Sequence, residues 1–124
     1  DKTIQLEGDA GMSTGILMRS GQIIVEGCAL ENTAVLLRGG RIVVKGSTKD
    51  FTGAEMTGGE VFIEGDAGSF ACAQMRGGAI YARQAQPLPP AKRYPLSPSE
   101  RTMVARTLEL GPMQALMCSR FGLQ

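Results

Sequence analysis

The chain has 124 residues, about the size of one domain, and its formal net charge is +1. This near neutrality gives no electrostatic reason to expect nucleic acid or an anionic membrane surface as a partner. The sequence contains no His, and its three cysteines form no CxxC pair, which argues against His-based catalysis, a disulfide framework and a zinc site. Because no apolar run is long enough for a membrane span and no signal peptide is visible, we expect a cytoplasmic protein.

The first two thirds of the chain consist of a repeat with a period of 19 residues. Four units follow one another without insertion, and residues 4–7 match the last four positions of a unit, so we expect a further strand at the start. Self-similarity at a fixed period predicts a solenoid, in which stacked units share one core. The glycines that show the period are Gly8, Gly27, Gly46 and Gly65 at one position, and Gly21, Gly40, Gly59 and Gly78 at another.

Each unit ends in a segment whose apolar residues alternate, which predicts a strand with two opposite faces. Because every unit runs in the same direction, the strands should be parallel, and 19 residues suffice for one coil. The fold class is therefore all-β, a parallel β-helix of about four coils over residues 1–83. The inward column is predicted to contain Ile23, Val25, Ile42, Val44, Val61, Ile63, Ile80 and Ala82, and a second apolar column Met18, Leu37, Met56 and Met75.

The repeated glycines are expected at the corners of the coil. A corner often needs a positive φ, and a Cβ atom there would clash with the next coil. The predicted structural turn glycines are Gly8, Gly21, Gly27, Gly39, Gly40, Gly46, Gly58, Gly59, Gly65, Gly77 and Gly78.

The outward columns carry charge in two cases and apolar side chains in a third. Opposite charges one coil apart, as in Arg41 beside Glu60, favour the correct register. The apolar column would be an exposed stripe, so we expect a covering layer from this chain or from a partner, with ordinary partial exposure as the alternative. The second charged column is Glu7, Glu26, Lys45, Glu64 and Arg83, and the apolar column, our candidate partner-binding surface, is Ile24, Val43, Phe62 and Tyr81.

After Arg83 the repeat ends, and residues 84–98 form a Pro-rich segment that we interpret as a stiff linker unable to continue the parallel ladder. The sequence SPSE, residues 97–100, predicts a capping box and a helix to about Leu110. Gly111 and Pro112 should stop it. The expected apolar side of this helix is Met103, Val104, Thr107 and Leu108, and a second short helix is expected through Met113, Leu116, Met117 and Phe121.

This helical tail, residues 99–124, is our candidate cover for the solenoid, with docking on another subunit as the alternative. No comparable cover precedes Ile4, which suggests a truncated domain or a partner at that end. The first residue is Asp, not Met, which is consistent with a start that is trimmed or cut from a longer chain.

No residue pattern predicts a catalytic, cofactor-binding or metal site on this chain. Nucleotide motifs are absent, and Asp9 and Asp66, which share a column, fit a turn better than calcium. Cys72 replaces glycine or alanine in its column, so we interpret it as a small buried residue and not as a reactive thiol. Glu55 and Glu60 are the nearest carboxylates for an acid–base pair, but their spacing does not single them out. Arg19, Arg38 and Arg76 share a column with Thr57 and are solvated charges or, alternatively, a strip that binds an anion or a partner.

The repeat has the form G-[DNS]-A-G-x-[FY]-x-G-x-x-M-x-G-G-x-[IV]-x-[IV]-x, which resembles the GXGXG-type units in the C-type chain of formylmethanofuran dehydrogenase. A less regular version occurs in the C-terminal domain of the large chain of glutamate synthase. The resemblance covers residues 4–83, and Leu30, Lys49 and Ser20 depart from it where the pattern has Gly. It depends on Gly46, Gly53, Met56, Gly58, Gly59, Val61 and Ile63, and on Gly65, Ala67, Gly68, Phe70, Met75, Gly77, Gly78 and Ile80.

The resemblance implies a right-handed parallel β-helix that acts as a non-catalytic scaffold subunit of an oxidoreductase complex in one-carbon metabolism, formylmethanofuran dehydrogenase-like or formyltransferase/hydrolase-like. It implies that other subunits carry a molybdenum or tungsten pterin, iron–sulfur clusters and a metal-dependent amidohydrolase site, with no cofactor on this chain. The alternative is a β-helix domain of a glutamate synthase-like enzyme, and a minor alternative is a free-standing β-helix hydrolase.

Overall fold

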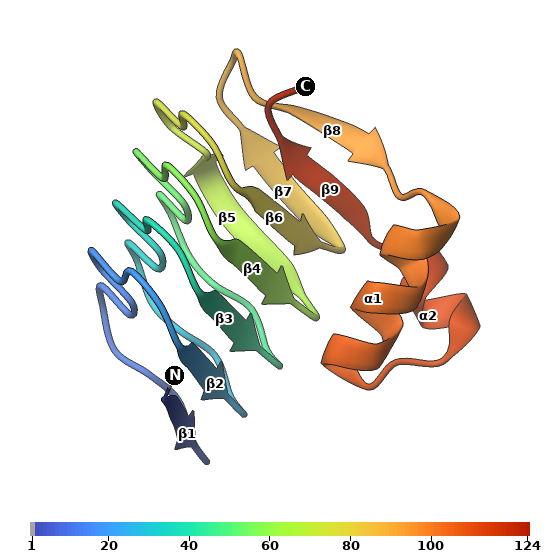
Figure 1. Ribbon diagram of the computed structural model, residues 1–124, viewed down its shortest axis with the longest axis horizontal. Helices are drawn as coiled ribbons and strands as arrows, with labels where there is room; N and C mark the ends of the chain where they lie inside the picture. Colours follow the sequence, from blue (N-terminus) through green and yellow to red (C-terminus); the bar gives the residue numbers. More distant parts are fainter. Residues whose placement is uncertain (1) are drawn as a thin grey trace.

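A computed structural model describes residues 2–124 (Figure 1). One sheet has the strand order β1-β2-β3-β4-β6-β9-β8, and a second sheet pairs β5 with β7. The strands are β1 (Thr3–Leu6), β2 (Gln22–Val25), β3 (Arg41–Val44), β4 (Glu60–Ile63), β5 (Asp66–Ala71), β6 (Ala79–Ala82), β7 (Gln84–Pro87), β8 (Lys92–Pro95) and β9 (Ser119–Gly122). The helices are α1 (Pro98–Leu108) and α2 (Pro112–Leu116).

The repeat forms a β-solenoid of about four turns, as its period predicts. Strands β1, β2, β3, β4 and β6 pair in parallel, and each residue lies beside the residue 19 positions later, as Ile42 lies beside Val61. Figure 1 shows the coils stacked along one direction, with the connecting segments aligned above one another. The parallel stacking follows from the common direction of the units.

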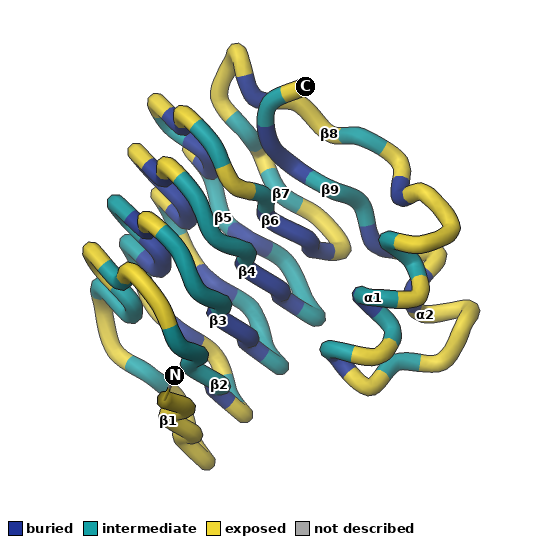
Figure 2. The backbone as a smooth tube through the Cα atoms, in the orientation of Figure 1, coloured by how far each residue is buried: buried dark blue, intermediate teal, exposed yellow. Residues whose placement is uncertain are grey.

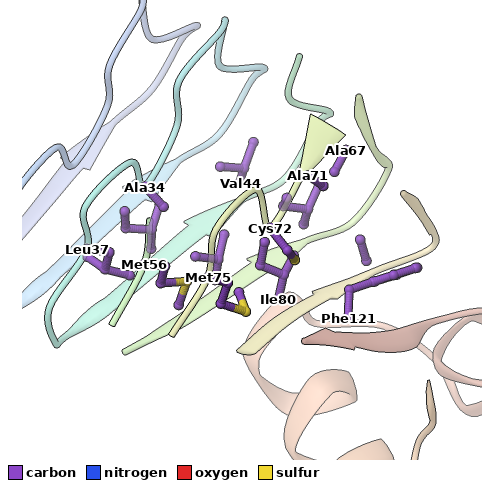
Figure 3. Close-up of a cluster of buried hydrophobic side chains, with 14 of the residues drawn as sticks. Ala34, Leu37, Val44, Met56, Ala67, Ala71, Cys72, Met75, Ile80 and Phe121 are labelled. Carbon is purple, nitrogen blue, oxygen red and sulfur yellow. The ribbon is translucent and has the colours of Figure 1, made fainter. Parts of the chain in front are cut away.

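The core lies inside the stacked coils. Alternate strand residues point inward, and in the middle and last coils they are fully buried, including Val44, Ile63 and Ile80. Figure 2 shows the buried stretches of the strands, and Figure 3 shows the side chains of Val44 and Ile80 in this core. The second predicted column is also confirmed, because Leu37, Met56 and Met75 belong to the same core. The corresponding residues of the first coil, Met18 and Ile23, are only partly buried.

The turn glycines lie where a side chain would meet the neighbouring coil. Gly40 has φ +84°, and a Cβ there would lie 2.7 Å from the carbonyl oxygen of Gly21. A Cβ on Gly58 would clash with the carbonyl oxygen of Arg38. Gly8, in the first coil, would meet nothing within 4 Å, because among residues 2–124 no coil lies beneath it. Where coils stack, a side chain at Gly40 or Gly58 would therefore displace the neighbouring backbone.

Each coil also has three alternate residues in the left-handed region, and many are not glycine. Bonds between coils hold this backbone, such as the Ala34 amide donating to the Thr14 carbonyl at 2.8 Å. A left-handed residue with a side chain costs roughly 1–2 kcal/mol, so these hydrogen bonds offset local strain. The residues are Ser13, Gly15 and Leu17, then Asn32, Ala34 and Leu36, then Phe51, Gly53 and Glu55, then Phe70, Cys72 and Gln74.

The segment predicted as a linker contains strands. β7 pairs in parallel with β5 with an irregular register, so the expectation that this segment cannot continue a parallel ladder is wrong. The reason is the position of the prolines: Gln84–Gln86 precede Pro87, so their backbone amides remain free to donate. β8 follows and joins the larger sheet through β9.

The tail closes the C-terminal end of the solenoid with an antiparallel strand. β9 pairs with β6, placing Phe121 beside Ile80, and Phe121 is fully buried in the core. The sequence predicts Phe121 in a helix; that prediction is wrong, because α2 ends at Leu116 and the chain then extends. Burial of this large aromatic ring over the last coil outweighs the helical spacing that suggests otherwise.

Helix α1 covers the apolar outward column. The predicted capping box is present: the Ser97 hydroxyl accepts from the Glu100 amide at 3.2 Å, and the Glu100 carboxylate accepts from the Ser97 amide at 2.8 Å. The apolar face of α1, Val104 and Leu108, packs against the column. The covering layer therefore comes from this chain. The residues of the column that form this second core are Val43, Phe62 and Tyr81, with Ile24 partly buried at its edge.

The outward charges pair only partly as the columns predict. Arg41 and Glu60 form the expected ion pair at 3.3 Å. Lys45, however, bonds Glu109 at 2.7 Å, and Arg83 bonds Asp66 at 3.2 Å, in place of neighbours in their own column. The end of α1 brings Glu109 over Lys45, a tertiary contact that the repeat alone does not contain.

Candidate functional site

Three of the four apolar candidates for partner binding lie beneath α1. Val43, Phe62 and Tyr81 are 2%, 0% and 5% exposed, so a partner would reach them only if α1 moved away. Burial raises the pKa of Tyr81, and the carboxylates of Glu100 and Glu60 raise it further. Ile24 remains half-buried and accessible at the edge of the helix.

Next to Ile24 lies a cleft of about 380 Å³ between the uncovered part of the sheet and the end of α1. Its wall includes Gln5 from β1, whose amide donates to the Glu26 carboxylate at 2.9 Å. Arg106 of α1 also lines the cleft, together with the ion pair of Lys45 and Glu109. The cleft therefore connects the one accessible apolar candidate with the first strand.

The three candidate arginines, Arg19, Arg38 and Arg76, are exposed along one edge of the coils. Backbone bonds between coils hold them in one column, since the Arg38 amide donates to Met18 and the Arg76 amide donates to Met56, each at 2.8 Å. Within residues 2–124, none of the three forms an ion pair within 4 Å. This arrangement fits solvated charge; partner or anion binding stays a prediction.

The column that contains Asp9 and Asp66 has a structural role. The Asp9 carboxylate accepts from the Cys28 amide at 2.8 Å, and the Ser47 hydroxyl accepts from the Asp66 amide at 3.0 Å. Between them the Cys28 sulfur accepts from the Ser47 amide at 3.4 Å. The side chains of Asp9, Cys28 and Ser47 thus each bond the backbone of the next coil, which fits the turn interpretation for Asp9. Asp66 instead begins strand β5, and its carboxylate pairs with Arg83. In the part of the chain that is described, no three His, Cys, Asp or Glu side chains gather in a way that could hold a metal ion.

The buried cysteine behaves as the sequence predicts. Cys72 is 0% exposed, and burial raises the pKa of its thiol to about 12. At neutral pH the thiol is therefore protonated as well as buried, which fits a packing role. Burial also raises the pKa of Cys118, and the nearby charge of Glu64 adds to this effect.

The two ends of the solenoid differ. Ile4 and Leu6 occupy the inward columns, beside Ile23 and Val25, but they are 62% and 40% exposed. At the other end β9 buries the last inward residues completely. Figure 2 shows β1 exposed along its length, in contrast to the strands in the middle of the stack. The first coil thus presents core positions to solvent.

The free edge of β1 adds a backbone docking element. The carbonyls of Lys2 and Leu6 accept from Gln22 and Glu26, each at 2.9 Å, so these groups face β2. Alternate residues of a strand face opposite neighbours, which directs the backbone groups of Thr3 and Gln5 to the open edge. An apolar surface next to a free strand edge is where another chain can add a strand.

Comparison of the chain with protein-family models, with curated proteins and with solved structures found no match. The resemblance of the repeat to GXGXG-type units is therefore an expectation from the sequence. Across residues 2–124, no helix combines the length and the apolar character needed to cross a bilayer.

Proposed function

We propose that this protein is a non-catalytic scaffold unit that assembles with other chains through the open first coil of its β-solenoid. The observation that carries the proposal is the exposure of Ile4 and Leu6, whose equivalents two coils later, Ile42 and Val44, are fully buried. Apolar burial stabilises by about 25 cal/mol per Å², so covering this coil end favours association. A strand added along β1 would satisfy its free backbone groups as well.

The complex we propose is formylmethanofuran dehydrogenase-like or formyltransferase/hydrolase-like. The support is the resemblance of the repeat over residues 4–83. In such an assembly other subunits would carry the molybdenum or tungsten pterin, the iron–sulfur clusters and the amidohydrolase site. This chain would contribute a rigid stack of coils, right-handed by the general preference of parallel crossover connections.

A second candidate is the β-helix domain of a glutamate synthase-like enzyme. The same open coil end favours it, because a neighbouring domain could cover Ile4 and Leu6 in place of a separate subunit. The two candidates differ in where the covering surface is encoded: on another polypeptide for the first, and on the same polypeptide for the second. The mass and the chain composition of the material purified from its own cell separate them.

The test uses a charge placed on the exposed core column. We expect Ile4→Glu to abolish co-purification of the partner chains, because a carboxylate cannot be buried there without a partner charge. Thr3→Glu is the matched control, since it adds the same charge to the outward face of the same strand. Ile4 is already 62% exposed, so neither change should shift the urea midpoint of the isolated chain appreciably.

The expected result is a defined complex with wild type and Thr3→Glu and a lone chain with Ile4→Glu, as seen by native mass spectrometry. A wild-type chain that purifies alone from its own cell would refute the proposal. So would a complex that keeps its composition when residue 4 is charged.

A further inference from the structure

A groove of about 880 Å³ separates the two C-terminal helices. It lies on α1 and α2 and shares no residue with the open coil end, so it is a second surface. The α1 side is formed by Pro98, Arg101, Thr102, Ala105 and Arg106, and the other side by Leu110, Pro112, Ala115 and Leu116.

The floor of the groove is a stripe of small side chains on α1. Pro98, Thr102 and Ala105 are spaced four and three residues apart, which places them on one helix face. This face is distinct from the one that holds Val104 and Leu108 against the sheet. Because the distance between packed helices depends on the side chains between them, small residues allow a third helix to approach closely.

The opposite wall is apolar, and its residue Leu116 is 58% exposed. Beside the groove, on the same short segment, Met113 and Met117 are 78% and 64% exposed. Three large, solvent-exposed apolar side chains in a segment of five residues are unusual for a surface with no binding role. Methionine adapts its shape readily to a partner, which suits a contact surface.

The charged side chains that line the groove are all positive. At 100° per residue, the small floor lies between Arg101 and Arg106, so the two guanidinium groups border it on both sides. Among the described residues, neither arginine has an ion pair within 4 Å, and no carboxylate lines the groove. The acidic residues nearest in sequence are engaged elsewhere: Glu100 with Arg120 at 3.6 Å, and Glu109 with Lys45 at 2.7 Å.

We propose that this groove binds an amphipathic helix of a partner protein, with an apolar face against Ala105 and Leu116 and carboxylates on its flanks against Arg101 and Arg106. The length of α1, 11 residues, is about 16 Å and matches three turns of such a helix. The groove is open along one side, which suits a helix with a polar outer face. A small molecule would need to be mostly enclosed. This binding does not depend on the open coil end.

The probe is a fluorescent 14-residue model helix with Leu at positions spaced three and four apart, Glu along both flanks and Ala elsewhere. Its matched control carries Lys in place of each Glu. With the full chain we expect the acidic peptide to bind with a Kd on the order of 100 μM or tighter, and the basic peptide at least about tenfold more weakly. Raising the salt from 50 to 500 mM should weaken the acidic peptide several-fold.

Variants locate the binding. Arg101→Ala with Arg106→Ala should weaken the acidic peptide about tenfold, and Leu116→Glu should weaken it further, by charge repulsion within the groove. Arg38→Ala is the matched control, because it removes an exposed arginine on a coil edge and should leave the Kd unchanged. Ile4→Glu should also leave it unchanged, which separates a failure here from a failure of the scaffold proposal. Circular dichroism of each variant checks that the fold is retained.

Three results would overturn the proposal. The acidic and basic peptides could bind equally well, the acidic peptide could fail to bind below about 1 mM, or the double arginine variant could bind like wild type. Binding of vesicles that contain anionic lipid through Arg101 and Arg106, without peptide binding, would instead identify a membrane-facing surface and would equally overturn it.

Discussion

The contact between Gly53 and Ile80 is predicted to be one of a series of size-matched pairs inside the solenoid. A Cβ on Gly53 would lie 2.5 Å from the Cδ1 methyl of Ile80, and a Cβ on Gly15 would likewise collide with Ile42. One coil away from Gly53, the equivalent residue is Ala34, and the residue in register with Ile80 is Val61. Where the strand carries the longer isoleucine the turn carries glycine, and where it carries valine the turn carries alanine.

This size matching allows the effect of Gly53→Ala on the free energy of unfolding to be worked out. The left-handed φ of +73° costs alanine about 1 kcal/mol, which the lower entropy of the unfolded chain offsets by about 0.4–1 kcal/mol. Overpacking against fully buried Ile80 adds about 1–3 kcal/mol. We expect a net loss of about 2 kcal/mol.

Ile80→Val alone should cost about 1 kcal/mol, since it removes one buried methyl. The double variant reproduces the Ala34 and Val61 arrangement, so it should lose less than about 1 kcal/mol in total. The two changes should therefore couple by about 2 kcal/mol in urea unfolding of the full chain, well above the ~0.5 kcal/mol scatter of independent sites. Strictly additive losses would refute size matching between turn and strand.

Three further outcomes follow from the buried and charged groups. In the folded protein a thiol reagent at pH 8 should modify exposed Cys28 quickly and Cys72 only after unfolding, because Cys72 is buried and its pKa is raised to about 12. Rapid labelling of Cys72 in the folded protein would contradict this. The hydrogen bond and charge of Lys45 lower the pKa of Glu109. The contact therefore stabilises the fold above the usual carboxyl pKa, and this stabilisation is lost as the pH falls through the lowered value. An NMR titration should show the pKa of Glu109 returning to its usual range in Lys45→Met, and an unchanged pKa would count against the contact. Phe121→Ala should cost about 3–5 kcal/mol in urea unfolding, and a loss below 1 kcal/mol would mean that β9 does not close the core.

The coils, their register and the inward columns could be predicted because they repeat. Val61 has apolar equivalents in the neighbouring units, Ile42 and Ile80, so its inward position does not depend on a single occurrence of the pattern. The capping box at Ser97 was likewise predictable, because it depends only on neighbours in the sequence.

The parts of the fold that occur once were not predictable in the same way. Phe121 has helical spacing to earlier apolar residues, yet it lies in a strand because the last coil, beside β6, buries it there. Lys45 has oppositely charged neighbours in its column, yet it pairs with Glu109, which α1 brings near. Such contacts depend on where the tail docks, and neither periodicity nor local propensity contains that information.

The antiparallel strand β9 gives the stack a direction of growth. A strand of reversed polarity cannot be followed by another coil of the parallel repeat, so β9 acts as a terminator beside β6. Copies of the 19-residue unit added ahead of β1 would lie beyond the coils that α1 covers, so they would leave both this stop and the contacts of α1 with Val43, Phe62 and Tyr81 in place. Each added unit would move the exposed edge of the stack about 4.8 Å further from β9, so the number of units sets the length of the stack.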